Sequence, residues 1–215
     1  MRLASFRKLL NSRYRPPLDV HEPVRPSGIS HLPQKLLSDC RVLSRRNDLL
    51  SAIPKGGIVA ELGVADGDFS ADILALNEPA TLHLVDTWDS AQYSSGLKRV
   101  KSRFAPQIEA GSVVIHHGRS IDVLRSFPDK FFDWIYIDTT HLYADTIQEL
   151  RLSARVINNG GFITGHDFRA GEPYGVIQAV FEFCLECQWQ FKLITLDGDG
   201  HFSFCLSAVS SVEHA

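Results

Sequence analysis

From residue 57 onward, short apolar, β-branched runs alternate with longer segments in which apolar residues recur at helical spacing. This alternation is typical of a parallel sheet whose crossover connections are helices. Strands are expected at residues 58–64, 81–87, 113–117, 133–138 and 161–166. Helices are expected at residues 68–76, 96–104, 120–126, 144–156 and 176–186. Two final apolar runs, 191–197 and 201–208, flank Gly198-Asp199-Gly200, and this short glycine-rich linker predicts an antiparallel hairpin.

The pattern therefore predicts an α/β fold with a mostly parallel seven-stranded sheet, a C-terminal antiparallel hairpin and helices on both faces. The chain before residue 54 differs. Prolines at positions 16, 17, 23, 26 and 33 exclude long helices from the first part. Residues 36–53 show helical periodicity. We expect residues 1–53 to form a basic arm and a helix, serving as a lid or a homodimer contact, and residues 54–215 to form the main domain.

Composition narrows the class of protein. The chain has 215 residues, of which 44% are hydrophobic, so it can bury a core without disulfides or metals. Residues 1–50 carry a net charge of +6 and the remainder −9, and an acidic body disfavours nucleic acid as a partner. No apolar run approaches the ~20 residues of a membrane span, so stable membrane insertion is not expected. Four scattered cysteines are too few for a disulfide framework, which favours a cytoplasmic protein.

The residues that follow the expected strands carry the candidate chemistry, because open parallel sheets bind ligands at the carboxyl ends of their strands. Gly63 and Gly67 bracket a tight turn after the first strand, where the backbone can approach a ligand. Asp86 ends the second strand about 20 residues further on, a placement suited to the two hydroxyls of a ribose. Ser120 follows the third strand and is suited to cap the next helix.

These residues resemble a known family. The pattern E-x-G-x-x-x-G from Glu61, the Asp that ends the second strand, and F-D-x-I-Y-I-D ending at Asp138 are similar to class I S-adenosylmethionine-dependent methyltransferases. Ala65 stands where that family usually has a central glycine. The resemblance covers residues 57–208 and implies a Rossmann-like fold with S-adenosylmethionine as cofactor. It assigns cofactor contacts to Glu61, Gly63, Val64, Gly67, Asp68, Phe69, Asp86, Thr87, Trp88, Gly118, Arg119 and Ser120, with Asp138 beside the transferred methyl group.

Two further segments are similar to the I-D-x-x-H-x-Y and G-G-x-x-x-G-H-D-Y signatures of a subfamily acting on small molecules. They are residues 137–143 and 160–168. The resemblance implies O-methylation of a small hydroxylated acceptor, a saccharide or a secondary metabolite. Residues 89–104, like the N-terminal arm, are candidates for a lid over that acceptor.

The catalytic group has two interpretations. Four ionisable residues lie at the ends of two strands that should be neighbours, so they can converge at one edge of the sheet. They are Asp138, His141, His166 and Asp167. In the first interpretation, Asp138 and Asp167, together with a histidine or a substrate oxygen, hold a divalent cation such as Mg²⁺, which orients and acidifies the acceptor hydroxyl. In the second, His141 or His166 removes the proton as a general base and no metal is required.

Other functions remain open on the sequence. They are N-methylation or different sulfonium chemistry, a non-catalytic S-adenosylmethionine-binding module, and a nucleotide-sugar or NAD enzyme on a similar sheet. Ligand preference separates the last of these, and turnover of an acceptor separates the second.

Overall fold

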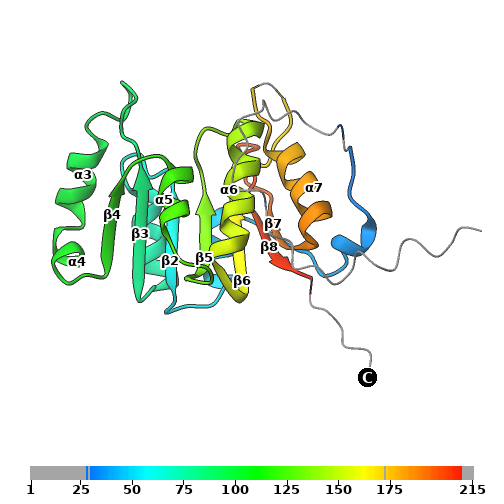
Figure 1. Cartoon of the computed structure of the whole chain (residues 1–215), viewed down its shortest axis with the longest axis horizontal. Coiled ribbons are helices and arrows are strands. Elements are labelled where there is room, and N and C mark those ends of the chain that lie inside the picture. Colours follow the sequence, from blue (N-terminus) through cyan, green and yellow to red (C-terminus); the bar gives the residue numbers. More distant parts are fainter. Residues whose placement is uncertain (1–27, 29, 172, 210–215) are drawn as a thin grey trace, which may run out of the picture.

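The computed structural model describes residues 28, 30–171 and 173–209, so residues 1–27 of the expected arm lie outside the described residues. The described strands form one eight-stranded sheet in the order β1-β7-β8-β6-β5-β2-β3-β4 (Figure 1). The strands are β1 (Arg41–Leu43), β2 (Ile58–Leu62), β3 (Thr81–Asp86), β4 (Val113–His117), β5 (Phe132–Ile137), β6 (Ile157–Gly165), β7 (Trp189–Thr195) and β8 (Phe204–Ala208).

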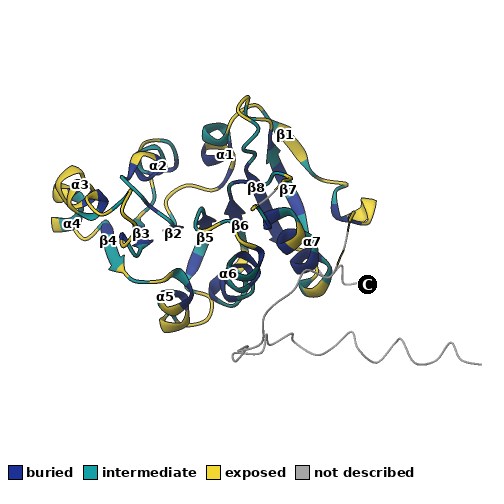
Figure 2. Ribbon diagram, turned by 90° about the horizontal axis from the view of Figure 1, so that it is seen from above, coloured by how far each residue is buried: buried dark blue, intermediate teal, exposed yellow. Residues whose placement is uncertain are grey.

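Helices cover both faces of this sheet. They are α1 (Arg46–Ala52), α2 (Asp68–Asp72), α3 (Gly96–Arg103), α4 (Ala105–Glu109), α5 (Ser120–Ser126), α6 (Tyr143–Val156) and α7 (Val176–Cys187), with a 3-10 turn η1 (Gln34–Leu36) and a π-helical turn η2 (Ile73–Asn77). Seen from above, α1 and α2 lie on one face, and α5, α6 and α7 lie on the other (Figure 2). None of the described helices is both long and apolar enough to cross a membrane.

The predicted fold class is confirmed. β2 pairs in parallel with β3 and β5, while β3 and β5 pair in parallel with β4 and β6. β8 lies antiparallel between β6 and β7, as the C-terminal hairpin requires. Its connection to β7 spans residues 196–203 and is longer than the expected Gly-Asp-Gly turn. Within this connection, the ring of His201 contacts Asp167.

The eighth strand corrects the expectation of a helix over residues 36–53. Arg41, Val42 and Leu43 pair in parallel with β7 and form the edge of the sheet. The helical signal came from two separate short elements, η1 before this strand and α1 after it. Pairing with residues about 150 positions further along the chain therefore overrode the local periodicity.

The core has two layers, one on each face of the sheet, and the central strand β5 contributes side chains to both. Phe132, Ile135 and Ile137 pack against the layer formed with α5, α6 and α7. Trp134 and Tyr136 point the opposite way, into the layer formed with α1, α2 and α3. From Trp134 to Ile137 this is the period-two alternation of a strand, in the apolar form that a fully buried parallel strand takes. Phe132 departs from it, at the point where the register of β5 against β6 shifts.

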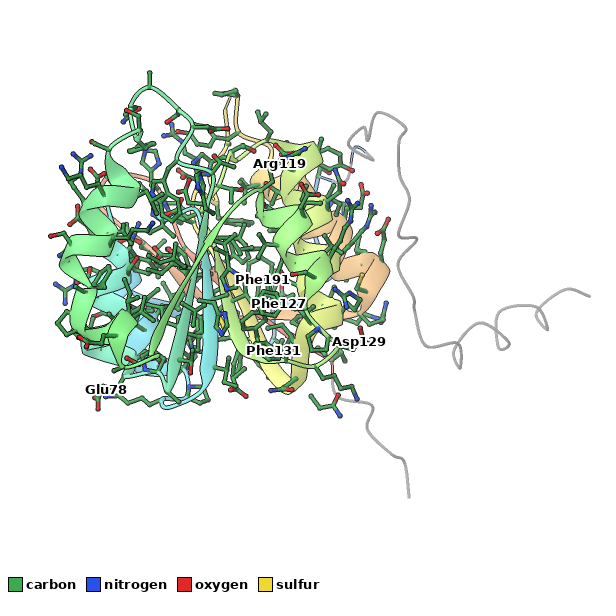
Figure 3. The ribbon with its side chains drawn as sticks, turned by 60° about the vertical axis from the view of Figure 1, so that its left-hand side comes forward. Glu78, Arg119, Phe127, Asp129, Phe131 and Phe191 are labelled. Carbon is green, nitrogen blue, oxygen red and sulfur yellow. The ribbon has the colours of Figure 1, made fainter. Side chains whose placement is uncertain are left out.

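All five parallel strands from β2 to β6 end at the same edge of the sheet. Arg119, which follows β4, lies at this edge, and Glu78 and Asp129, which precede β3 and β5, lie at the opposite one (Figure 3). From β2 the chain continues outward to β3 and β4, whereas β5 and β6 extend in the other direction. The boundary between β2 and β5 is therefore the topological switch point, where open sheets place their ligands.

Candidate active site

A cavity of about 610 Å³ opens at this switch point. Its walls come from the carboxyl ends of β2, β3, β4 and β5 and from the first residues of α1, α2 and α5. It is lined by the residues that the sequence assigned to the cofactor, apart from Gly67 and Trp88. Its volume falls within the roughly 300–1,000 Å³ of small-molecule sites.

The turn after β2 requires glycine at two positions for different reasons. Gly63 has φ +87°, and a Cβ there would lie 1.9 Å from the carbonyl oxygen of Asp138, which follows the neighbouring strand. Gly67 has φ +80°, and its Cβ would meet the ring of Phe104 at 2.9 Å. Gly63 therefore permits the strand ends to approach each other beside the cavity. Gly67 permits the turn to pack on the segment after α3.

Asp86 connects the end of β3 to this turn. Its Oδ2 accepts hydrogen bonds from the amides of Val64 (2.7 Å) and Ala65 (2.9 Å), and its Oδ1 accepts one from the amide of Trp88 (2.8 Å). Asp86 and Thr87 both line the cavity. The Asp86 carboxylate is therefore held rigidly, with acceptor capacity left for ligand hydroxyls, because each carboxylate oxygen has about two acceptor sites.

Trp88 does not flank the cavity as the sequence analysis expected. It is buried, with φ +45°, and its indole N–H donates to the carbonyl of Ala65 at 2.8 Å. Gly96, at the start of α3, has room for no Cβ beside this ring. The indole therefore packs in the core layer that includes α3, on the side of the turn away from the cavity, and supports the turn through its hydrogen bond to Ala65.

The far end of the cavity lies at β4 and α5. Gly118, Arg119 and Ser120 line it, and the Ser120 hydroxyl donates to Glu149 Oε1 at 2.5 Å. The Thr139 hydroxyl donates to the other oxygen of Glu149 at 2.8 Å. Burial raises the pKa of Glu149 to about 7, against the effect of these two hydrogen bonds.

Sequence reasoning missed Glu149, although a signal was present. It lies in the middle of α6 on the buried side, together with Thr146, Leu150 and Ser153. An acidic residue at a position that helical spacing assigns to the core face indicates a buried polar partner.

Glu61 and Arg46 lie at the β2–β5 end of the cavity. Glu61 is 1% exposed and accepts a hydrogen bond from the Ser70 hydroxyl, and burial raises its pKa to about 8. The Arg46 guanidinium lies over the Phe69 ring, 3.7 Å from its centroid, and 3.7 Å from Asp138 Oδ2. Arg46 was also missed, because it belongs to the segment expected to be a lid or dimer contact.

Asp138, His141, His166 and Asp167 converge, as the order of the strands implied. The Nδ1 atoms of His141 and His166 lie 3.2 and 3.3 Å from Asp167 Oδ2, and His166 Nδ1 lies 3.7 Å from Asp138 Oδ1. His201 adds a third imidazole, whose Nδ1 contacts Asp167 Oδ1. One buried carboxylate therefore lies among three histidines.

The electrostatics of this acid–histidine cluster differ between its two acids. Burial alone would raise the pKa of Asp167, but hydrogen bonds with His166 and His201 and the neighbouring histidine charges hold it well below its usual range. Burial raises the pKa of Asp138, with His166 and Arg46 acting in the opposite direction. Asp167 is therefore the anion that orients the imidazoles.

The backbone of the cluster is also unusual. His141 has φ +61° and Asp167 φ +51°, a region that non-glycine residues rarely adopt. The His141 carbonyl accepts a hydrogen bond from the amide of Gly175 at 2.8 Å, which holds this conformation. Such conformations concentrate at functional sites, where the surrounding structure maintains them.

The cluster also contains a candidate cation site. Among the described residues, Asp138, His141 and Asp167 each offer a ligand atom, and the three atoms lie within 4.8 Å of one another. The sequence suggested the two acids with an unspecified histidine or a substrate oxygen, and His141 is the histidine that lies within reach of both acids. Carboxylate oxygens with one imidazole nitrogen suit Mn²⁺, or Mg²⁺ with additional oxygen ligands.

Comparison with known proteins identifies the family. Residues 60–168, about half of the chain, match a family described as a methyltransferase domain. No curated protein sequence matches the chain significantly.

Solved structures share the fold at low sequence identity. An rRNA methylase from Streptococcus thermophilus is 11% identical with a TM-score of 0.56, covering 76% of this chain and 94% of its own. A tRNA methyltransferase from B. subtilis is 13% identical with a TM-score of 0.57, covering 78% and 67%. A geranyl diphosphate methyltransferase in complex with SAM is 11% identical with a TM-score of 0.57, covering 76% and 82%. These neighbours act on different acceptors, so they indicate the fold and not the substrate.

Proposed function

The chain belongs to this methyltransferase-domain family, and we propose that it is an S-adenosylmethionine-dependent O-methyltransferase of a small hydroxylated acceptor, a saccharide or a secondary metabolite. One observation carries the proposal. The cavity at the switch point opens directly onto a cluster of histidines and acids, through the shared lining residues Asp138 and His141. The acidic charge of residues 51–215 argues against rRNA or tRNA as the acceptor.

The cavity residues suit the proposed methyl donor. The Asp86 carboxylate keeps one acceptor site, on Oδ1, for a ribose hydroxyl, and Glu149 and Ser120 offer polar atoms at the β4 end. When bound, S-adenosylmethionine supplies a methyl group activated by a positively charged sulfur. The role of the chain is to hold donor and acceptor in line and to receive the proton of the acceptor.

His141 is the better candidate for the base. Its Nδ1 faces Asp167, which favours the tautomer with a proton on Nδ1 and leaves Nε2 free to accept the hydroxyl proton. The same reasoning applies to His166. However, His141 lines the cavity and is 28% exposed, whereas His166 does not line it and is 13% exposed. We assign His141 as the base, with Asp167 as the positioning residue.

A cation is the second candidate for the same step, and the grouping of Asp138, His141 and Asp167 favours it. A divalent cation there would stabilise the alkoxide form of the acceptor, so that no general base is required. The two mechanisms differ in their response to a chelator. They also differ in the role of His141, which cannot bind a cation and accept a proton with the same nitrogen.

The test begins with binding. We expect micromolar affinity for S-adenosylhomocysteine by calorimetry and none for NAD⁺ or UDP. Transfer of a labelled methyl group is then measured over saccharide, phenolic and amine acceptors, with tRNA included. Methylation of a hydroxyl acceptor supports the proposal; methylation of amines or tRNA alone, or binding without any turnover, contradicts it. Loss of turnover in chelator that Mn²⁺ restores selects the cation, and unchanged turnover in chelator selects the histidine.

A further inference from the structure

Arg46 is the one arginine at the β2–β5 end of the cavity wall, within the part of the chain that the structure describes. The other lining arginine, Arg119, follows β4, at the opposite end of the cavity. The Arg46 side chain is 26% exposed, so its charge is half-buried beside the acids Glu61 and Asp138.

The guanidinium is held in place by stacking and is not saturated by hydrogen bonds. It lies on the Phe69 ring at 3.7 Å and faces the Tyr136 ring at 5.8 Å. Its ion pair with Asp138 is 3.7 Å long, too long for a good hydrogen bond. A guanidinium has five N–H donors in a planar fork, and this arrangement leaves them available to a ligand in the cavity.

The position of Arg46 is fixed by long-range contacts. Its backbone amide donates to Asp197 Oδ1 at 3.0 Å, at the end of β7. The next residue, Asn47, donates to Asp72 in α2 at 3.2 Å. The start of helix α1 is therefore held by contacts with both the loop after β7 and helix α2, and these contacts preorganise the Arg46 guanidinium.

Four backbone amides of the turn beside Arg46 already have hydrogen-bond partners. The amide of Gly63 donates to the carbonyl of Val85, and that of Gly67 to the carbonyl of Val64. The amides of Val64 and Ala65 both donate to Asp86. An anionic ligand group at this end would meet two acids and these four occupied amides, and Arg46 is the cationic side chain suited to bind it.

From this arrangement we infer that Arg46 binds the α-carboxylate of the amino-acid portion of the methyl donor. The inference rests on the proposed function. A stacked, planar guanidinium matches a carboxylate through two parallel hydrogen bonds. The acids beside it suit the ammonium group of the same zwitterion. The segment that the sequence predicted to be a lid or dimer contact thus contributes a ligand-binding residue.

The test compares two ligands that differ only in this carboxylate. They are S-adenosylhomocysteine and S-adenosyl-3-thiopropylamine, its decarboxylated analogue, each titrated by calorimetry against the wild-type protein and Arg46→Met. We expect Arg46→Met to weaken S-adenosylhomocysteine about 10- to 100-fold, the range for a charge-assisted hydrogen bond. Affinity for the decarboxylated analogue should stay within about threefold or increase. The variant removes the positive charge of Arg46, which would otherwise repel the ammonium group of the analogue and compete with it for Glu61 and Asp138.

Arg45→Met is the matched control. Arg45 is the neighbouring residue, its side chain is 74% exposed, and it pairs with Asp48 outside the cavity. This variant should bind both ligands as the wild type does. Arg46→Lys provides a second variant if Arg46→Met does not fold. It keeps the charge but loses the planar fork, and we expect an intermediate loss confined to S-adenosylhomocysteine.

The outcomes separate the inference from the proposed function. If Arg46→Met weakens both ligands equally, or neither, while the wild type binds them, the inference is wrong and the proposed function stands. If the wild type binds neither ligand, the proposed function fails and the inference fails with it.

Discussion

The two halves of the cavity edge are built by different means. On the β2–β3 side, the Asp86 carboxylate accepts hydrogen bonds from backbone amides. On the same side, the absence of a side chain at Gly63 lets its backbone lie against the carbonyl of Asp138. On the β5–β6 side, the acid–histidine cluster is held by contacts between ionisable side chains from separate loops. The first half should therefore be the more sensitive to steric change at Gly63, and the second the more sensitive to loss of charge at Asp167.

The largest effect is expected at Gly63. Gly63→Ala would place a methyl group 1.9 Å from the Asp138 carbonyl at a φ of +87°, so strands β2 and β5 would have to separate. We expect a loss of about 3 kcal/mol or more in the free energy of unfolding, measured by urea denaturation.

Gly111→Ala is the control, because Gly111 has φ +76° with nothing within 4 Å of its Cβ position. It should lose only about 1 kcal/mol, the cost of the backbone conformation. Equal losses in the two variants would show that close approach of the strands does not limit stability.

Asp167→Asn tests the other half. An amide offers one acceptor oxygen where the carboxylate contacts three Nδ1 atoms, so the histidines lose their common orientation. We expect methyl transfer to fall about 100-fold or more, the scale of misplacing a general base. Affinity for S-adenosylhomocysteine should stay within about twofold, because Asp167 does not line the cavity.

Asp129→Asn is the matched control, since Asp129 is exposed at the opposite edge of the sheet (Figure 3). It should leave both turnover and affinity unchanged. A parallel loss of turnover and cofactor affinity in Asp167→Asn would mean that the two halves are not independent.

The same contrast explains what could be predicted from the sequence. β4 and α5 begin and end at the expected residues, because apolar runs and turn residues are local signals. β1 and Arg46 could not be found, because their positions depend on β7 and Asp197, about 150 residues away. Trp88 was placed in the adenine pocket by resemblance, whereas in the structure its indole supports the turn.

Glu149 provides a test of pH dependence. Its pKa, raised to about 7 by burial, means that the folded state binds a proton more tightly than the unfolded chain. Its contribution to stability is therefore fully present below about pH 4.5 and is lost as the pH rises through 7. Relative to Glu149→Gln, the wild type should lose on the order of 1 kcal/mol per pH unit between pH 5 and 7.

Urea denaturation at pH 5, 6, 7 and 8 measures this difference, with Glu109→Gln as the control because Glu109 is exposed. Asp145 and Arg119 act in opposite directions on the pKa of Glu149, and the difference between the two proteins includes their effect. A wild-type minus Glu149→Gln difference that does not change with pH would contradict a protonated Glu149.

The smallest effect is expected at Trp88, and it sharpens the division between the cavity and its support. Trp88→Phe removes the N–H that donates to the Ala65 carbonyl and leaves that half-buried acceptor without its partner. We expect a loss of about 1–2 kcal/mol in the free energy of unfolding. Affinity for S-adenosylhomocysteine should change by less than about twofold, since the indole does not line the cavity. A tenfold fall in affinity with unchanged stability would contradict this division and mean that Trp88 contacts the ligand directly. Because the Trp88 side chain is only 5% exposed in this structure, the turn after β2 would then have to open when the ligand binds.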